Sequence, residues 1–188
     1  MKVTCIIGSA RNNGSTAYLI DSMIRGMQES NIDIARYCIG DADIHYCIGC
    51  KKCYTDGKCV QSDDVEKIVT DILSSDYVVI GSPSYWGDVP GQLKTFWDRN
   101  TPYGDTNPNR VLVAEKKIKG IGLSVRAGMT ERENTVILGF IEHYFGHLGI
   151  EMVKQISVCN NDTLDDLKEK NSKYIDEMHE LGRNIESL

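Results

Sequence analysis

Four cysteines stand within thirteen consecutive residues, in the segment CIGCKKCYTDGKC at positions 47–59. Cys47, Cys50, Cys53 and Cys59 form the pattern C-x2-C-x2-C-x5-C. A C-x2-C-x2-C run can wrap three thiolates around one [4Fe–4S] cluster, and a fourth cysteine nearby completes the ligands. Structural zinc sites usually pair two C-x2-C knuckles across a longer gap, which this segment lacks. The spacing therefore favours an iron–sulfur cluster, with zinc, disulfides or redox thiols, and a relic loop without metal as the alternatives.

The composition indicates the compartment in which these thiols work. The chain of 188 residues has a formal net charge of −6, so it offers no basic surface for nucleic acid or an anionic membrane. No apolar run approaches the roughly 20 residues that span a bilayer, and the N-terminus, MKVTCIIGSA, lacks the features of a signal peptide. We therefore expect a cytoplasmic protein, in which clustered cysteines more often bind metals or do redox chemistry than form structural disulfides.

Short β-branched segments alternate with segments of helical period along the whole chain. Strands are predicted at residues 2–8, 32–40, 77–83, 117–125 and 151–158. Five β–α units in regular alternation predict a single α/β domain over residues 1–188, with a parallel sheet and helices on both faces, because each parallel crossover needs a long connection. The cysteine-rich loop, at about 44–61, lies between the second strand and the helix that follows it.

The helices between the strands must carry their apolar residues toward the sheet. Two of them are predicted to begin with capping boxes, Asp63 with Glu66 and Thr130 with Glu133, and a last helix is predicted to begin at Thr163. The helix after Thr130 is expected to bury a set of apolar residues: Val136, Ile137, Phe140, Ile141, Tyr144 and Phe145. The loops that lead from strand to helix then share one edge of the sheet, where such folds bind ligands.

The first of these loops, GSARNNGST at residues 8–16, has the chemistry of a phosphate site. Gly8 and Gly14 permit close approach of the backbone, Arg11 supplies a permanent charge, and the next helix begins with free N–H groups. The loop is neither G-x-G-x-x-G nor G-x-x-x-x-G-K-[ST], so the usual signatures of dinucleotide and nucleoside triphosphate sites are absent. A glycine-rich turn that only caps the helix is the structural alternative.

Two further loops add aromatic and polar groups at the same edge. Tyr85 and Trp86 lie in a Ser/Pro/Gly-rich turn directly after a buried strand. There they either contact a planar ring, or they simply cover the end of the sheet or make a subunit contact. Arg126 and Gly128, in SVRAGM after the fourth strand, can offer a charge and backbone N–H groups to carbonyl acceptors. A phosphate site, a place for a planar ring and polar donors beyond it together fit FMN.

These motifs, in this order, resemble the NADPH-dependent FMN reductase branch of the flavodoxin-like superfamily, and within it the iron–sulfur flavoproteins. The resemblance rests on GSARNNGST, CIGCKKC…GKC…SDD and GSPSYWGDVPGQLKTFWDR, and it extends from residue 3 to about residue 130. The last two β–α units fit the fold but carry no motif. The resemblance implies a flavodoxin-like, doubly wound five-stranded parallel sheet of order 2-1-3-4-5, which agrees with ligand binding at the switch point of the strand order.

The resemblance also implies which residues bind the cofactors. The FMN phosphate would be bound by the first loop, at Ser9, Arg11, Asn13, Gly14, Ser15 and Thr16. The isoalloxazine ring would be lined by Pro83, Ser84, Tyr85, Trp86 and Gly87, and its pyrimidine edge by Ser124, Arg126, Ala127 and Gly128. Ser15 stands where relatives often have Asn, and the third loop departs from the glycine-rich turn common in the family.

The implied activity is electron transfer through FMN in a homodimer or homotetramer. No side chain has the pattern of a catalytic acid, base or nucleophile, and none is needed, because flavin itself carries hydride and single-electron chemistry. The donor would be NAD(P)H or a ferredoxin, and the acceptor a small molecule such as a quinone, oxygen, peroxide or flavin. The alternatives are a cluster-free NAD(P)H-dependent FMN or quinone reductase, a flavodoxin-type electron carrier and a zinc-stabilised regulatory module.

Other residues with metal-binding or electrostatic chemistry have simpler interpretations. Three lysines interleave with the clustered cysteines and either offset cluster charge or belong to a solvated loop. Cys5, Cys38 and Cys159 lie singly in or near strands and are expected to be small buried hydrophobic residues. His143 and His147 are four residues apart on a helix, but no third metal ligand is near them in sequence, so a surface or interface position is expected.

Overall fold

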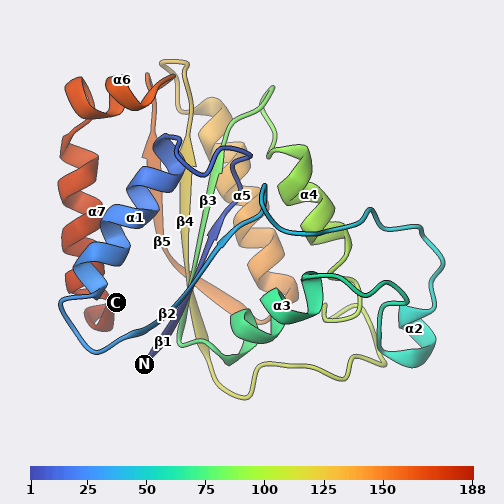
Figure 1. Ribbon diagram of the computed structural model, residues 1–188. Coiled ribbons are helices and arrows are strands. Elements are labelled where there is room, and N and C mark those ends of the chain that lie inside the picture. Colours follow the sequence, from blue (N-terminus) through green and yellow to red (C-terminus); the bar gives the residue numbers. More distant parts are fainter.

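Five parallel strands form one sheet at the centre of the computed structural model, which describes residues 1–188 (Figure 1). In chain order the strands are β1 (Lys2–Ile7), β2 (Asp33–Cys38), β3 (Tyr77–Pro83), β4 (Ile118–Val125) and β5 (Ile150–Val158). Their order across the sheet is β2-β1-β3-β4-β5, and all neighbouring pairs are parallel. This confirms the predicted doubly wound sheet, and the predicted strand ends are correct to within two residues.

Helices cover both faces of the sheet, and each face has its own hydrophobic core. On one face lie α1 (Ser15–Met27) and α7 (Lys173–Arg183), and on the other lie α3 (Val65–Ser74), α4 (Gly91–Asp98) and α5 (Arg132–His147) (Figure 1). Two glycines let α1 and α7 touch backbone to backbone. A Cβ on Gly26 would lie 2.1 Å from the His179 carbonyl oxygen, and one on Gly182 would lie 2.0 Å from that of Met23.

The predicted helix from Thr163 is divided in two. A short helix, α6 (Leu164–Glu169), begins with a capping box between Thr163 and Asp166, and the chain leaves helical geometry before α7 begins. Asn171, in the break, donates its side-chain amide to the carbonyl groups of Cys159 and Asn160 at 3.3 and 3.1 Å. Such side-chain bonds to backbone compete with helix formation, which explains why a continuous apolar period did not give a continuous helix. A single 3-10 turn, η1 (Ile185–Ser187), ends the chain.

Neither of the other two predicted capping boxes is formed. The N-cap positions of α3 and α5 are Asp64 and Glu131, and neither makes a side-chain cap. The carboxylates of Asp63 and Glu133 bind arginines, and Asp63 Oδ1 also accepts from the Val65 N–H at 3.2 Å. The prediction was wrong because a local pattern does not show a distant partner that binds the same carboxylate.

Two apolar residues of α5 were also wrongly predicted to be buried. Val136 and Phe140 are 43% and 40% exposed, whereas Ile137 and Ile141 beside them are fully buried. The first pair is one helical turn apart and lies away from the sheet. The core-facing stripe of α5 is therefore narrower than its apolar content indicates.

The cysteine-rich segment forms a long loop between β2 and α3 that extends outward from the sheet (Figure 1). Its only regular structure is the short helix α2 (Cys53–Asp56), which was not predicted. None of the helices is both long enough and apolar enough to cross a bilayer.

Candidate functional site

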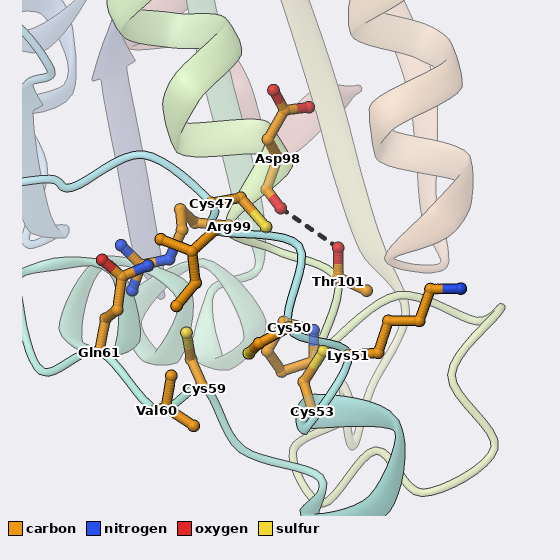
Figure 2. Close-up of a pocket in the computed structure, with 12 residues that line it drawn as sticks. Cys47, Cys50, Lys51, Cys53, Cys59, Val60, Gln61, Asp98, Arg99 and Thr101 are labelled. Atoms are coloured by element: carbon orange, nitrogen blue, oxygen red, sulfur yellow. Dashed lines mark hydrogen bonds between the residues drawn. The ribbon is translucent and has the colours of Figure 1, made fainter.

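The four clustered cysteines line one cavity at the base of the long loop (Figure 2). Cys47 and Cys50 are exposed, Cys53 and Cys59 are half-buried, and none forms a disulfide. Burial raises the pKa of the Cys53 thiol, and the neighbouring thiols of Cys59, Cys47 and Cys50 raise it further. All four side chains contribute to the wall of this cavity. The structure therefore brings together all of the predicted metal ligands.

Four thiols are a donor set that zinc and iron–sulfur clusters both use. Four thiolates around one Zn²⁺, each at about 2.3 Å, would lie about 3.8 Å apart. No group of three or more Cys, His, Asp or Glu side chains is arranged to hold a single metal ion. In a cubane cluster each thiolate binds a different iron, so the sulfurs surround a larger object. The four thiols line one cavity, and the structure contains no metal-binding arrangement of them.

A buried ion pair closes the loop at its base. The side chains of Arg99, which follows α4, and Asp63, which precedes α3, are each 1% exposed, and Arg99 Nη1 lies 2.5 Å from Asp63 Oδ2. Arg99 Nη1 also donates to the His45 carbonyl oxygen at 2.8 Å, and the His45 N–H donates to Asp63 at 3.1 Å. Burial raises the pKa of Asp63, but the bonds from Arg99 and from backbone N–H groups outweigh it, so this pKa lies below its usual value. The segments before and after the cysteines are thereby joined through one guanidinium.

The outer part of the loop is held by residues 100–110. Asn107 donates its side-chain amide to the Cys53 carbonyl oxygen at 3.0 Å, and Asn109 donates to that of Tyr54. Gly57 has a left-handed φ of 68°, and a Cβ there would lie 2.2 Å from the Asn109 carbonyl oxygen. Sequence reasoning missed these contacts because asparagine in a loop indicates a turn and gives no sign of a partner 54 positions away.

The predicted phosphate loop leads from β1 into α1 at the carboxyl edge of the sheet. The N–H groups of Ser15, Thr16 and Ala17 have no hydrogen-bond partner in the protein, and the first turn of α1 contains no acidic residue. Free N–H groups at a helix N-terminus attract an anion. The Ser15 hydroxyl is not free, because it donates to the Thr163 carbonyl oxygen at 3.0 Å. Ser15 therefore offers its backbone rather than its side chain to a ligand.

The loop after β3 makes a tight turn with an exposed tryptophan. Tyr85 and Asp88 exchange backbone hydrogen bonds of 2.9 and 3.1 Å, and between them Trp86 and Gly87 have φ angles of 57° and 78°. Positive φ at both central residues is typical of a type I′ turn, but it is rare for a large side chain and costs about 1–3 kcal/mol. The Trp86 side chain is also fully exposed. A strained residue that presents a large aromatic ring to solvent indicates contact with a ligand or partner.

Glu133 of α5 joins the second and third predicted loops. Its carboxylate accepts from the Ser84 hydroxyl at 2.6 Å and lies 3.1 Å from Arg126 Nη2. The Arg126 guanidinium also folds over its own loop, since a Cβ on Gly128 would lie 2.2 Å from Arg126 Nη2. Ser124 is fully buried in β4, with its hydroxyl donating to Asn134 at 2.7 Å, so its side chain is not free at the edge. Glu133 was missed as a site residue because its position in the sequence indicated a helix cap.

An open cavity of about 540 Å³ lies between the β3 loop and the cysteine segment. It is lined by Tyr85 on one side and by Ile44 and Tyr46 on another, with the first residues of α4 completing the wall. Tyr46 directly precedes Cys47. The predicted flavin edge and the beginning of the cysteine segment therefore border the same space.

The other predicted residues have structural positions. Cys5 and Cys38 are buried, as expected, whereas Cys159 is only half-buried. His143 and His147 lie on the surface of α5, with their Nε2 atoms 3.2 Å apart. His147 Nδ1 is bound to Asp105 at 2.6 Å, and no third metal ligand joins the two histidines.

Comparison with known proteins gives both a family and a fold. The family model described as NADPH-dependent FMN reductase matches residues 1–142. The chain is 36% identical over 104 residues to an iron–sulfur flavoprotein of Archaeoglobus fulgidus, an alignment that covers 55% of this chain and 47% of the relative. It is 37% identical over 102 residues to an iron–sulfur flavoprotein of Methanocaldococcus jannaschii, covering 54% of this chain and 53% of that protein. The chain therefore spans about half the length of these relatives.

A solved structure shows the same architecture over the entire chain. The NAD(P)H:quinone oxidoreductase from Methanothermobacter marburgensis superposes with a TM-score of 0.76, covering 99% of this chain and 97% of that one, at 15% sequence identity. At this identity the likeness establishes the fold alone. The flavodoxin-like topology predicted from the sequence is thus confirmed by the strand order and by a structural neighbour.

Proposed function

Because the chain belongs to the NADPH-dependent FMN reductase family, we propose that it is an FMN-dependent oxidoreductase that also carries a [4Fe–4S] cluster. The observation that supports the cluster most strongly is the set of four free cysteines around one cavity. The similarity to two iron–sulfur flavoproteins supports the same conclusion. Cys47, Cys50, Cys53 and Cys59 are its ligands, and the buried pair of Arg99 and Asp63 fixes the base of the loop that carries them.

Three loops at the carboxyl edge of the sheet hold FMN in this proposal. The free N–H groups at the start of α1, with Arg11 beside them, bind the phosphate. Tyr85 and Trp86 contact the isoalloxazine ring, and the loop of Arg126 to Gly128 faces its pyrimidine edge. Glu133 fixes the last two loops relative to each other through Ser84 and Arg126. When bound there, FMN supplies the hydride and single-electron chemistry that the side chains lack.

The open cavity beside Tyr85 is the proposed entry for a small electron donor or acceptor. Its volume of about 540 Å³ is in the range of small-molecule sites and accommodates a nicotinamide or quinone ring. NAD(P)H or a ferredoxin is the proposed donor, and a quinone, oxygen, peroxide or flavin the proposed acceptor. The wall formed by Ile44 and Tyr46 would place such a molecule between the flavin edge and the cysteine segment.

Assembly into a homodimer or homotetramer is part of the proposal. Exposed apolar side chains on α5 and in the loops near it support a subunit contact: Trp86, Met129, Val136 and Phe140. The outward extension of the cysteine loop also suits a contact in which the loop of one protomer approaches the FMN of its partner (Figure 1).

Cofactor analysis tests the proposal directly. Protein purified without oxygen is analysed for iron, acid-labile sulfide, zinc and FMN. We expect about four irons and four sulfides per FMN. FMN without metal would identify a cluster-free flavin reductase, and zinc in place of iron would show that the cysteine loop has a structural role.

A further inference from the structure

One nitrogen of the buried guanidinium has no hydrogen-bond partner. Arg99 is 2% exposed, and its Nη1 and Nη2 atoms are bound to Asp63, with Nη1 also bound to the His45 carbonyl oxygen. The third nitrogen, Nε, is buried and makes no hydrogen bond. Buried N–H groups in folded proteins nearly always have an acceptor, so an unpaired one calls for a water, an ion or a bound group beside it.

The position of Arg99 indicates what that acceptor is. Arg99 lines the same cavity as the four clustered cysteines (Figure 2). It also lines a second cavity, which it shares with Cys59. Three of its five N–H groups are bound to Asp63 and His45, so the Nε–H and one N–H of Nη2 remain for a further acceptor. Gln61, Asp98 and Thr101 also carry oxygen acceptors at the first cavity, and the cysteine sulfurs are the acceptors there that would belong to the proposed cluster.

We propose that Arg99 donates its Nε–H to a sulfur of the bound cluster and thereby raises the reduction potential of that cluster. This inference rests on the proposed iron–sulfur site. Reduction adds a negative charge to the cluster, and both nearby charge and hydrogen bonds to the sulfurs set its potential. A charge-assisted hydrogen bond from a cation favours the more negative, reduced form. Because a guanidinium does not lose its proton in proteins, the effect persists throughout the neutral pH range.

Substitution of Asp63 tests the direction in which charge near the cysteine cavity shifts the reduction potential. Arg99 and Asp63 form a pair whose charges oppose each other beside the cysteine cavity. Removal of the Arg99 charge leaves a carboxylate there, which disfavours reduction. Removal of the Asp63 charge leaves an uncompensated guanidinium, which favours reduction of the cluster. If the pair only held the loop in place, the two substitutions would not shift the potential in opposite directions, because the loss of either charge would loosen the same contact.

The test is an EPR-monitored redox titration of the full chain, purified without oxygen, that determines the midpoint potential of the cluster. Arg99→Met is expected to lower the ratio of reduced to oxidised cluster at least tenfold at the wild-type midpoint, a shift of about 59 mV for a one-electron couple. Asp63→Asn is expected to shift the potential in the positive direction. Arg99→Lys, which keeps the charge, should stay closer to wild type than Arg99→Met does.

Lys51→Met is the matched control, because Lys51 lines the same cavity but is exposed to solvent that screens its charge. It should shift the potential less than Arg99→Met. Shifts of the same sign in Arg99→Met and Asp63→Asn, or no shift in either, would overturn the inference. If Arg99→Met binds no cluster, Asp63→Asn decides, and an unshifted potential in that variant refutes the role of the pair. Wild-type protein without iron would instead defeat the proposed function itself, before any variant is made.

Discussion

Sulfur ligation by the clustered cysteines is the property on which the proposed function depends at the scale of single residues. Cys59 is the proposed ligand farthest along the chain, and it lines both cavities next to Arg99. A serine hydroxyl is a poor replacement for a thiolate ligand of iron. We expect Cys59→Ser to retain less than about half of the wild-type iron and to keep its FMN, as measured by iron and flavin analysis.

Cys159→Ser is the control for this measurement, because Cys159 lies after β5 and outside the cysteine cavity. It should keep its full iron content. Equal iron in Cys59→Ser and wild type would remove Cys59 from the ligand set.

The buried ion pair gives a prediction for stability. Asp63→Ala leaves the Arg99 guanidinium buried without its partner, which costs about 3–5 kcal/mol of unfolding free energy. Urea unfolding of the metal-free protein at neutral pH measures this loss. Asp98→Ala removes a carboxylate that is 49% exposed and paired with Lys94, so it should cost no more than about 0.5 kcal/mol. Similar losses in the two variants would show that the pair with Arg99 contributes little.

The contribution of Asp63 has a definite pH dependence. Its pKa is lowered in the folded state, because the bonds from Arg99 and backbone N–H groups outweigh the effect of burial. Stability from this group is therefore fully present above the unfolded pKa of about 4 and is lost as the pH falls through the lower, folded pKa. Asp63→Ala should make the acid side of the stability curve less steep than in wild type.

At the scale of elements, the sequence predicted strands better than helix ends. Strand β3 is buried on both faces, so its continuous β-branched run identified it to the residue. The N-caps of α3 and α5 were predicted at Asp63 and Thr130, one residue before the observed Asp64 and Glu131. The carboxylates of Asp63 and Glu133 bind arginines, and a capping pattern gives no sign of such partners. The same two carboxylates bind residues of the candidate site, so the failed helix caps coincide with contacts in that site.

Two glycines of the cysteine loop provide a matched pair for testing how α2 is held. Both have left-handed φ, but a Cβ at Gly57 would lie 2.2 Å from the Asn109 carbonyl oxygen, whereas one at Gly49 would meet nothing within 4 Å. Gly49→Ala should lower the local stability of the loop by the backbone strain alone, about 1–2 kcal/mol. Gly57→Ala adds a steric clash and should cost about 2–4 kcal/mol. Amide hydrogen exchange at residues 53–57 measures the difference, and equal protection in both variants would contradict the packing described here.

At the scale of the whole molecule, topology explains how the site could be found in part from sequence. The strand order puts the loops after β1, β3 and β4 at one edge, so motifs far apart in sequence were correctly expected to lie together. The contacts of Arg99 with His45 and Asp63 could not be predicted from the sequence. They depend on the end of α4 lying beside the base of the cysteine loop, a tertiary contact that leaves no periodic signal in either segment.

The exposed apolar face of α5 carries the prediction about assembly. Phe140→Glu places a charge in the proposed contact and should weaken association at least tenfold, which corresponds to about 1.4 kcal/mol. Sedimentation velocity should then show a smaller species than wild type. Glu142→Lys changes charge on the same helix without removing apolar surface and should sediment like wild type. An unchanged assembly in Phe140→Glu would place the subunit contact elsewhere.

The close backbone contact between α1 and α7 has a consequence for the order in which the protein matures in the cell. The helix that begins at the phosphate loop reaches its final packing only against residues 173–183, through Gly26 and Gly182. During synthesis, the nascent chain must leave the ribosome at least as far as residue 183 before these two helices can meet. Capture of flavin at this edge is therefore expected only after residue 183 has emerged, whereas the cysteine loop and the contacts of Arg99 with His45 and Asp63, complete by residue 110, emerge earlier.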